Sequence, residues 1–467
     1  MQKKQLVLQK VLVEDYAAEG KSLSKLDGKV MFIEGAVPGD IIDLQIIKSK
    51  KDWAEGRPVR FHEFSKDRVE PFCEHFGVCG GCKWQMLPYN KQLHYKENEV
   101  AQQLRRIGKV TLPVIAPILG ANQTRRYRNK LDFTFSNRRY LLSHEIDRNT
   151  VIAQENALGF HVPRIFDKVV DINTCHLMEE PTNIIKNTIR DFASLQGYSY
   201  YDVKKHQGWL RNLILRVCQT GEVMVNVCFS YEDALERQKL FDHLLLQVPS
   251  ITSLLYTINP KWNDSINDLH PQVYSGNGYI TERLEDFIFR IGPKSFFQTN
   301  TFQGELLYKV TREFAELTGE QIVYDLYCGT GSIGIFLSRH AKKIIGVDVI
   351  DEAIRDAREN ANLNGVAHAQ FYSGDVIDVC NDQFFQQHGH PDVIITDPPR
   401  SGMHEKLLNK INEMEAQTVV YVSCNPATQA RDLNMLDEKY CITRVQPIDM
   451  FPHTHHIENV VQLKKRQ

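Results

Sequence analysis

Two short motifs near the C-terminal end of the chain combine a carboxylate with a thiol. Asp397 opens the sequence Asp-Pro-Pro-Arg at 397–400, and Cys424 lies in Ser-Cys-Asn-Pro at 423–426. An apolar run precedes each motif, and such runs are typical of buried parallel strands, at whose carboxyl ends an open α/β sheet binds its ligands. We therefore expect both motifs at one cleft. Cys424 is then either a nucleophile or a small buried hydrophobic residue, and the Asn-Pro that follows it favours the nucleophile.

A thiol beside a carboxylate has the parts that methylation of uracil at carbon 5 requires. That carbon is a poor nucleophile until a thiolate adds to carbon 6 and turns the ring into an enolate, which can attack a sulfonium methyl group. A base must then remove the proton from carbon 5 so that the thiol can leave. Cys424 is the candidate nucleophile and Glu458 the candidate base. Spacing alone explains Glu458 equally well as a surface residue beside a last strand.

A cysteine cluster is the second group of side chains that could do chemistry. Cys73, Cys79 and Cys82 have the spacing C-x5-C-x2-C with glycines among them, and Cys175 could be a fourth ligand. The spacing lacks the paired C-x-x-C arms of a zinc ribbon, which favours a closed, structural iron–sulfur site over zinc. The alternative is a set of buried free thiols. The histidines at 453, 455 and 456 lack a matched cysteine or carboxylate, which disfavours a metal site there.

A glycine loop follows the first strand expected in the C-terminal segment. The strand covers 322–327, and Cys-Gly-Thr-Gly-Ser-Ile-Gly at 328–334 leads into a helix. The next strand ends at Asp348, which could accept hydrogen bonds from ribose hydroxyls, and Asp375 after the third strand could face an adenine amino group. The pattern G-x-G-x-x-G does not separate a dinucleotide from S-adenosylmethionine. A dehydrogenase has no use for the strand-end cysteine downstream, so we favour S-adenosylmethionine.

These motifs need three supporting segments. Residues 1–66 contain short strands, expected at 5–14, 30–34, 40–48 and 58–64, and suggest a small barrel of the OB type. Residues 67–284 begin with the cysteine cluster and continue as mixed α and β structure. Residues 285–467 alternate strand and helix, which predicts an α/β domain with helices on both faces of a parallel sheet.

Composition narrows the class of protein. The 467 residues are 42% hydrophobic and 24% charged, with no apolar run long enough for a membrane span and no secretory signal at the N-terminus. The ten irregularly spaced cysteines fit a reducing compartment. We expect a cytoplasmic monomer that does not bind membranes.

Basic residues gather locally although the net charge is −2. They occur with tyrosines at 125–130 and 138–140, and again at 48–51. Guanidinium groups pair with phosphates and tyrosines stack on unpaired bases, while an isolated charge run is usually a solvated face. Beside a base-modifying site, the better interpretation is an RNA-binding surface.

Taken together, the chain resembles the RNA uracil-5-methyltransferases of the bacterial 23S rRNA type, which carry an N-terminal TRAM domain. The resemblance covers nearly the whole length. It rests on ordered motifs at 27–30, 35–40, 295–300, 325–331, 397–400, 423–426 and 452–454.

The resemblance implies a Rossmann-like methyltransferase domain that uses S-adenosyl-L-methionine, with Cys424 as nucleophile and Glu458 as base. It implies a [4Fe-4S] cluster on Cys73, Cys79, Cys82 and Cys175. The cofactor contacts that it implies are Gln298, Tyr327, Ser332, Asp348, Asp375 and Asp397. Asp397 would lie between the cofactor and the uracil, while Ser332 and Asp348 stand where the family more often has Asn and Glu.

We expect 23S rRNA as the substrate, because tRNA-type bacterial members of the family usually lack the cysteine cluster. The alternative within the same chemistry is the uracil of the tRNA T-loop. A non-catalytic RNA-binding iron–sulfur protein would be expected to lack the pair Cys424 and Glu458, and both residues are present.

Overall fold

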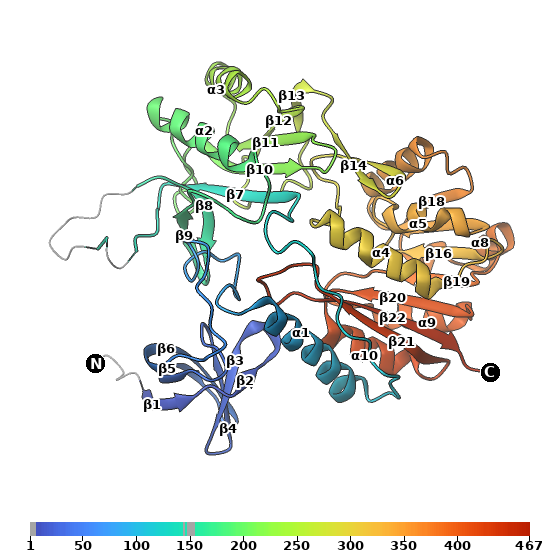
Figure 1. The fold of residues 1–467 in the computed structure, drawn as a ribbon. Coiled ribbons are helices and arrows are strands. Elements are labelled where there is room, and N and C mark those ends of the chain that lie inside the picture. The colour runs from blue at the N-terminus through green and yellow to red at the C-terminus, as the bar shows by residue number, and fades with distance from the viewer. Residues whose placement is uncertain (1–5, 143–144, 147–154) are drawn as a thin grey trace.

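The computed structural model describes residues 6–142, 145–146 and 155–467, and its strands form sheets that follow one another along the chain (Figure 1). Residues 1–5, for which the sequence predicts no secretory signal, lie outside the described part. None of the described helices is long and apolar enough to cross a membrane.

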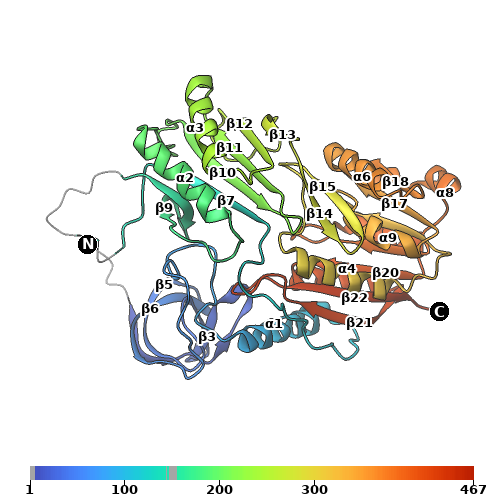
Figure 2. The ribbon, with the colours of Figure 1, turned by 45° about the horizontal axis from the view of Figure 1, so that its top comes forward.

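The N-terminal part is a sheet that curves around a small apolar core (Figure 2). Its described strands have the order β1-β5-β6-β4-β3-β2. They are β1 (Val7–Leu12), β2 (Asp15–Tyr16), β3 (Ser22–Leu26), β4 (Lys29–Ile33), β5 (Ile41–Ser49) and β6 (Trp53–Glu63), with a short turn of helix, η1 (Ala18–Gly20), after β2.

The sequence predicted β1, β4, β5 and the second half of β6, and it missed β2 and β3. The inward-facing residues of β3 are Ser22 and Ser24, both buried. Ser22 is accommodated there because its hydroxyl donates to the carbonyls of Ile33 and Ala36. An inward row of serines lacks the apolar alternation by which a strand is recognised.

The central part is a mostly antiparallel sheet with two helices on one face (Figure 1). The strand order is β13-β12-β11-β10-β7-β8-β9, counted over the described residues. Its elements are β7 (Lys130–Ser136), β8 (Ala157–Val162), β9 (Ile165–Asp171), α2 (Thr182–Leu195), β10 (Leu210–Val217), β11 (Val223–Phe229), α3 (Ala234–Gln247), β12 (Ser253–Ile258) and β13 (Gln272–Gly276). The mixed α and β content predicted for this segment agrees with this arrangement.

A hairpin, β14 (Ile280–Leu284) with β15 (Phe287–Ile291), leads into the C-terminal part. Its apolar side chains, including Ile280 and Phe289, belong to the core of that part. The domain boundary predicted between residues 284 and 285 falls at the turn of this hairpin, and the boundary stays a prediction.

The C-terminal part is a sheet with the order β18-β17-β16-β19-β20-β22-β21 in the described residues. Strands β18 to β20 are parallel, and β22 runs antiparallel to both of its neighbours. The elements are α4 (Thr301–Ala315), β16 (Ile322–Leu326), α5 (Ser332–Leu337), η3 (Ser338–His340), β17 (Lys343–Asp348), α6 (Asp351–Leu363), β18 (Ala369–Ser373), α7 (Val376–Val379), α8 (Asp382–His388), β19 (Val393–Thr396), α9 (Glu405–Met414), β20 (Thr418–Ser423), α10 (Pro426–Leu436), β21 (Tyr440–Ile448) and β22 (Glu458–Lys465).

Two apolar cores lie on opposite faces of this sheet. One includes residues of α4, α5 and α6, and the other includes residues of α8, α9 and α10. The prediction of an α/β domain with helices on both faces is therefore confirmed.

Helix α1 (Tyr89–Gln103) and the π-helical turn η2 (Leu104–Gly108) come from the segment predicted as central, yet they pack on the C-terminal part. Val100 and Leu104 are buried in the second core together with Leu433 of α10. This helix becomes important for the site below.

Candidate active site

The predicted thiol and carboxylate motifs meet at the carboxyl edge of the parallel strands. Asp397 follows β19 and Cys424 follows β20, its neighbour in the sheet. The two motifs are also joined by side chains, because Asn425 Nδ2 and Thr428 Oγ1 donate to the Arg400 carbonyl at 3.0 and 3.2 Å. Asn425 also caps α10 by accepting the Ala427 N–H. The Asn-Pro after Cys424 therefore ends β20 and starts a helix, which fixes where the thiol leaves the sheet.

Glu458 is brought to the same place by the antiparallel strand β22. Ser423 pairs with Asn459 and Val422 with Val460, so the β20–β22 register points Cys424 and Glu458 to the same end of this strand pair. Glu458 is buried and Cys424 is partly buried. Glu458 is therefore no surface residue beside a last strand.

Burial makes the acids at this site harder to ionise. Burial raises the pKa of Cys424 to about 11, with further contributions from Glu458 and Asp397, while the Arg400 guanidinium acts in the opposite direction. Burial raises the pKa of Asp397 to about 7. The pKa of Glu458 lies well above its usual range because of burial and the neighbouring Asp397 carboxyl. Two carboxyls so placed share a proton at neutral pH.

The glycine loop lies beside these acids, at the ends of β16 and β17. Gly331 has φ of +75°, and a Cβ there would lie 2.9 Å from the Phe371 ring, so only glycine fits. Asp348 accepts the N–H groups of Gly329 and Ile350, both at 2.9 Å. This carboxylate, expected to face ribose hydroxyls, also holds the loop in shape.

The other predicted cofactor contacts lie around this loop. Ser332 begins α5, and its hydroxyl lies 2.8 Å from the Tyr308 hydroxyl. Tyr327 has φ of +62°, a strained value for a residue with a Cβ. Burial raises its pKa, and so do the nearby carboxylates of Asp375 and Asp348. Asp375 itself is exposed and caps α7 by accepting the Ile377 N–H at 2.9 Å.

Gln298 reaches this region from the segment before α4. It is buried, and its main-chain carbonyl accepts a hydrogen bond from Asn129 at 2.9 Å. The Thr330 hydroxyl donates to the Phe296 carbonyl at 3.4 Å, which ties this segment to the glycine loop. Five of the six predicted contact residues end or follow the strands β16 to β19, namely Tyr327, Ser332, Asp348, Asp375 and Asp397. Gln298 lies two residues after Phe296, which contacts the glycine loop.

Sequence reasoning missed Asp325, a carboxyl inside β16. It is fully buried, one oxygen accepts the Gly334 N–H at 2.9 Å, and the other oxygen has no partner. Burial raises its pKa to about 7. The sequence did contain a signal, because Asp325 is an acidic residue within an otherwise apolar strand. Burying a carboxyl costs free energy, so such a residue indicates a functional or structural role.

The four cysteines predicted as ligands line one cavity of about 350 Å³. Burial raises the pKa of Cys79 to about 12 and of Cys82 to about 11, and the other thiols of the group add to both effects. Across the described chain, no three Cys, His, Asp or Glu side chains are close enough to hold a single metal ion. Other side chains, among them His75, Arg128 and Asp132, line the same cavity. A [4Fe-4S] cluster binds each thiolate through a different iron, and its presence here stays a prediction.

Only some side chains of the basic run at 125–130, which was expected to bind RNA, are exposed. The expectation that Tyr127 stacks on a base is wrong, because Tyr127 is buried and its hydroxyl donates to the Pro452 carbonyl at 2.9 Å. Arg138 and Arg139 form ion pairs with carboxylates of the chain itself. Arg125 and Arg126 are exposed, although Arg125 stacks on the Phe72 ring and Arg126 lies 3.5 Å from Glu179.

The histidines before Glu458 are neutral. Burial lowers the pKa of His453 and His455 to about 4, and of His456 to about 3. The main-chain N–H of His453 donates to Gln92 at 2.8 Å, and the His453 ring packs edge-on against Phe72.

The chain is similar in sequence to known proteins and families. Residues 270–466 match the model of the tRNA (uracil-5-)-methyltransferase family, and residues 8–59 match the TRAM domain. An uncharacterized RNA methyltransferase of Bacteroides thetaiotaomicron is 52% identical over 96% of this chain and its own full length. One of Porphyromonas gingivalis is 47% identical over 97% of this chain and 98% of its own.

A solved structure extends the likeness to three dimensions. The Pyrococcus abyssi tRNA (uracil-54, C5)-methyltransferase, in complex with S-adenosyl-L-homocysteine, is 27% identical with a TM-score of 0.74. The match covers 97% of this chain and all of that one. On this evidence the chain belongs to the TRAM-domain RNA uracil-5-methyltransferase family, whose methyl donor is S-adenosylmethionine.

Proposed function

We propose that this protein methylates carbon 5 of a uracil in RNA through a covalent bond between Cys424 and the base. The observation that carries the proposal is the placement of Cys424 and Glu458 at one end of the β20–β22 pair, with Asp397 beside both. These are the nucleophile and carboxylates that the reaction needs, on elements that hold them rigidly.

The reaction begins once the Cys424 thiol has lost its proton to solvent. The thiolate sulfur then bonds to carbon 6, and the electrons of the ring double bond move toward carbon 5 and the neighbouring carbonyl. Carbon 5 takes the methyl group from the sulfonium, whose sulfur keeps the bonding electrons and becomes a neutral thioether. Glu458 accepts the carbon 5 proton, the double bond re-forms, and the bond from carbon 6 to sulfur breaks to release the thiolate.

Without substrate or methyl donor, the site disfavours the Cys424 thiolate that the reaction needs, and nearby cations favour it. Because burial raises the pKa of Cys424 and both carboxyls, the thiol is protonated at neutral pH. Arg400 favours the thiolate, since its guanidinium interacts with the sulfur. A sulfonium bound beside Asp397 supplies a second positive charge. For that donor we propose contacts from Gln298, Tyr327, Ser332, Asp348, Asp375 and Asp397.

We further propose that Cys73, Cys79, Cys82 and Cys175 hold a [4Fe-4S] cluster and that the substrate is 23S rRNA. The shared cavity of the four thiols supports the cluster, which would cross-link the segments that carry them. The cluster in turn supports the rRNA assignment. A tRNA T-loop uracil is the second candidate, favoured by the Pyrococcus abyssi enzyme that modifies tRNA.

Two substitutions test the chemistry. Cys424→Ala should keep RNA and S-adenosylhomocysteine binding but lose methyl transfer, because no enolate can form. Glu458→Gln should transfer the methyl group and then accumulate a protein–RNA adduct, because the carbon 5 proton stays in place. Denaturing gels with labelled RNA measure both, and methylation by Cys424→Ala would refute the nucleophile assignment.

A further inference from the structure

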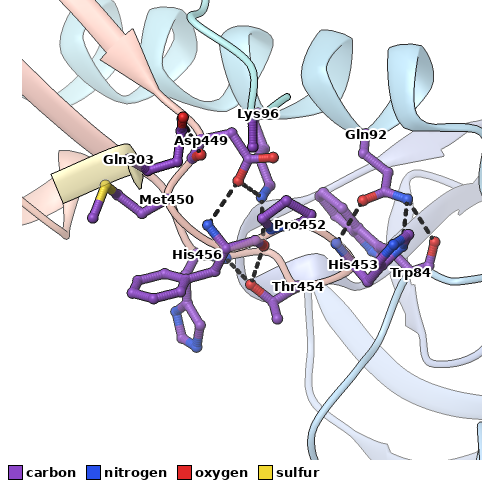
Figure 3. Close-up of polar contacts among 12 residues, drawn as sticks. Trp84, Gln92, Lys96, Gln303, Asp449, Met450, Pro452, His453, Thr454 and His456 are labelled. Atoms are coloured by element: carbon purple, nitrogen blue, oxygen red, sulfur yellow. Dashed lines mark hydrogen bonds and ion pairs between the residues drawn. The ribbon is translucent and has the colours of Figure 1, made fainter. Parts of the chain in front are cut away.

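The loop between β21 and β22 ends at Glu458, and its main chain is bound by surrounding groups over most of its length (Figure 3). Every carbonyl from residue 449 to residue 453 accepts a hydrogen bond. The donors in chain order are Gln303 (2.8 Å), Asn300 (2.8 Å), Lys96 with Thr454 (3.1 and 2.8 Å), Tyr127 (2.9 Å), and the amides of Lys83 and Trp84 (2.8 and 3.0 Å). A loop held in this way has one conformation, and that conformation sets where Glu458 begins β22.

Helix α1 supplies the only charged side chain among these donors. Its residues Tyr89, Gln92 and Lys96 are spaced to lie along one helical face, which meets the loop. The Gln92 side chain accepts the His453 N–H at 2.8 Å, and its amide group donates to the carbonyls of Trp84 and Leu87. Helix α1 therefore contacts the loop between β21 and β22 at His453 as well as through Lys96.

The centre of this contact is a buried ion pair. Lys96 Nζ lies 2.6 Å from Asp449 Oδ1, and both side chains are fully buried. The same Asp449 oxygen accepts the Phe451 N–H at 3.0 Å, and the other accepts the Tyr89 hydroxyl at 2.8 Å. Lys96 thus holds the loop twice, through Asp449 and through the Phe451 carbonyl (Figure 3).

Stability alone is a poor reason for such a pair. Two charges lose their hydration when they are buried, and two apolar side chains of similar volume often stabilise a fold as well or better. Apolar side chains have no donors or acceptors, however, so they cannot select one main-chain conformation for residues 449–451. The ion pair specifies the shape of the loop that carries Glu458.

We propose that Lys96 is a positioning residue for proton abstraction from carbon 5. The inference rests on the proposed role of Glu458 as the base. With the loop displaced, Glu458 no longer reaches the carbon 5 proton, so the double bond does not re-form and the bond between carbon 6 and the Cys424 sulfur persists. Formation of that bond depends on β20 and α10, whereas the hydrogen bonds of Lys96 go to Asp449 and Phe451, so it should survive the displacement.

The test compares the adduct in variants of the full-length enzyme. Lys96→Met should bind S-adenosylhomocysteine like the wild type, yet leave about tenfold more RNA bound covalently after denaturation, the effect expected of a misplaced catalytic group. Lys96→Arg keeps the cation and should restore part of the turnover. Tyr89→Phe removes one hydrogen bond to Asp449 and should act in the same direction, more weakly.

Arg211→Met is the matched control. Arg211 is another buried cation that donates to main-chain carbonyls, here those of Asn259 and Lys261 in the central part. Its loss should lower the thermal stability as the loss of Lys96 does, without trapping RNA. Thermal denaturation and calorimetry with S-adenosylhomocysteine are measured on every variant.

The outcomes separate the two proposals. If Lys96→Met and Tyr89→Phe lose turnover only in proportion to folded protein, as Arg211→Met does, then Lys96 has no positioning role. If Lys96→Met does not fold, Tyr89→Phe decides by the same criterion. If Glu458→Gln traps RNA and the Lys96 variants do not, only the positioning role fails. If Glu458→Gln traps none, the base assignment fails, and the inference about Lys96 fails with it.

Discussion

At the scale of single residues, the site consists of acidic side chains whose pKa values are raised, which makes them harder to ionise. Burial raises the pKa of Cys424, Asp397, Glu458 and Asp325, and the nearby carboxyls oppose one another's ionisation. Such a site resists carrying several negative charges until a positive charge enters. The arrangement would make the nucleophile most available when the cationic methyl donor is bound, which limits unproductive thiol chemistry.

The same charges predict how the reaction depends on pH. Glu458 accepts a proton only when it is ionised, and burial together with the Asp397 carboxyl raises the pKa of Glu458 well above its usual range. Burial also raises the pKa of Asp397 to about 7. Because both shifts are upward, activity should fall as pH decreases through the titration of this pair, by about tenfold per unit on its acid side. Single-turnover methylation of labelled RNA between pH 5.5 and 8.5, roughly the range around that pKa, measures this.

Asp397→Asn provides the control for that profile. It removes the carboxyl that raises the pKa of Glu458, so the inflection should move to lower pH when the methyl donor is saturating. An inflection that stays in place would show that the titrating group is not this pair.

At the scale of elements, segments far apart in the chain meet at the cysteine cavity. Cys73, Cys79 and Cys82 precede α1, while Cys175 follows β9. A Cβ at Gly80 would lie 2.9 Å from the His161 carbonyl of β8, so this loop packs tightly on the central sheet. A cluster here would hold the loop before α1 against the central part.

The cluster predicts a clear effect of a single substitution. Protein purified without oxygen should be brown and contain iron and sulfide. Cys79→Ser should abolish the colour and lower the thermal stability, because metal-binding free energy contributes to folding. The matched control is Cys441→Ser, since Cys441 is also partly buried but lies on β21 in the C-terminal part and does not line the cavity. Stoichiometric zinc without sulfide would contradict the assignment.

At the scale of the whole molecule, the TRAM domain touches the loop that carries Glu458. The Trp84 side chain donates to the Gly20 carbonyl at 3.3 Å, and a Cβ on Gly20 would lie 2.8 Å from the His455 Cβ. RNA bound by this domain would therefore lie close to the catalytic loop. Contacts from several parts of the molecule favour a structured RNA target over a short single strand.

The proposed cluster, together with the TRAM contact, predicts the preferred substrate. Purified enzyme with radiolabelled S-adenosylmethionine should label protein-free 23S rRNA more than tRNA. Assembled ribosomes should be poorer substrates than free rRNA, because the uracil must leave its stack to reach Cys424 and assembly restricts that movement. Label in tRNA alone would favour the T-loop alternative and leave the chemistry intact.

Much of the fold and part of the site were predictable from local pattern. The apolar runs before Asp397 and Cys424 are parallel strands, and the carboxyl ends of neighbouring parallel strands lie at one edge, so these two residues could be placed together in advance. The glycine loop was equally clear, because its glycines are required by the backbone itself. Strand β3 was missed because serines occupy its inward face.

Periodicity and spacing within short segments were therefore enough to predict the fold class and the strand-end residues. The remaining features of the site depend on tertiary contacts. The place of Glu458 depends on an antiparallel pairing, the burial of Tyr127 on a contact with Pro452, and the ion pair of Lys96 with Asp449 on residues 353 positions apart. Such contacts do not produce a periodic pattern in the sequence, because the packing of whole elements determines which residues meet.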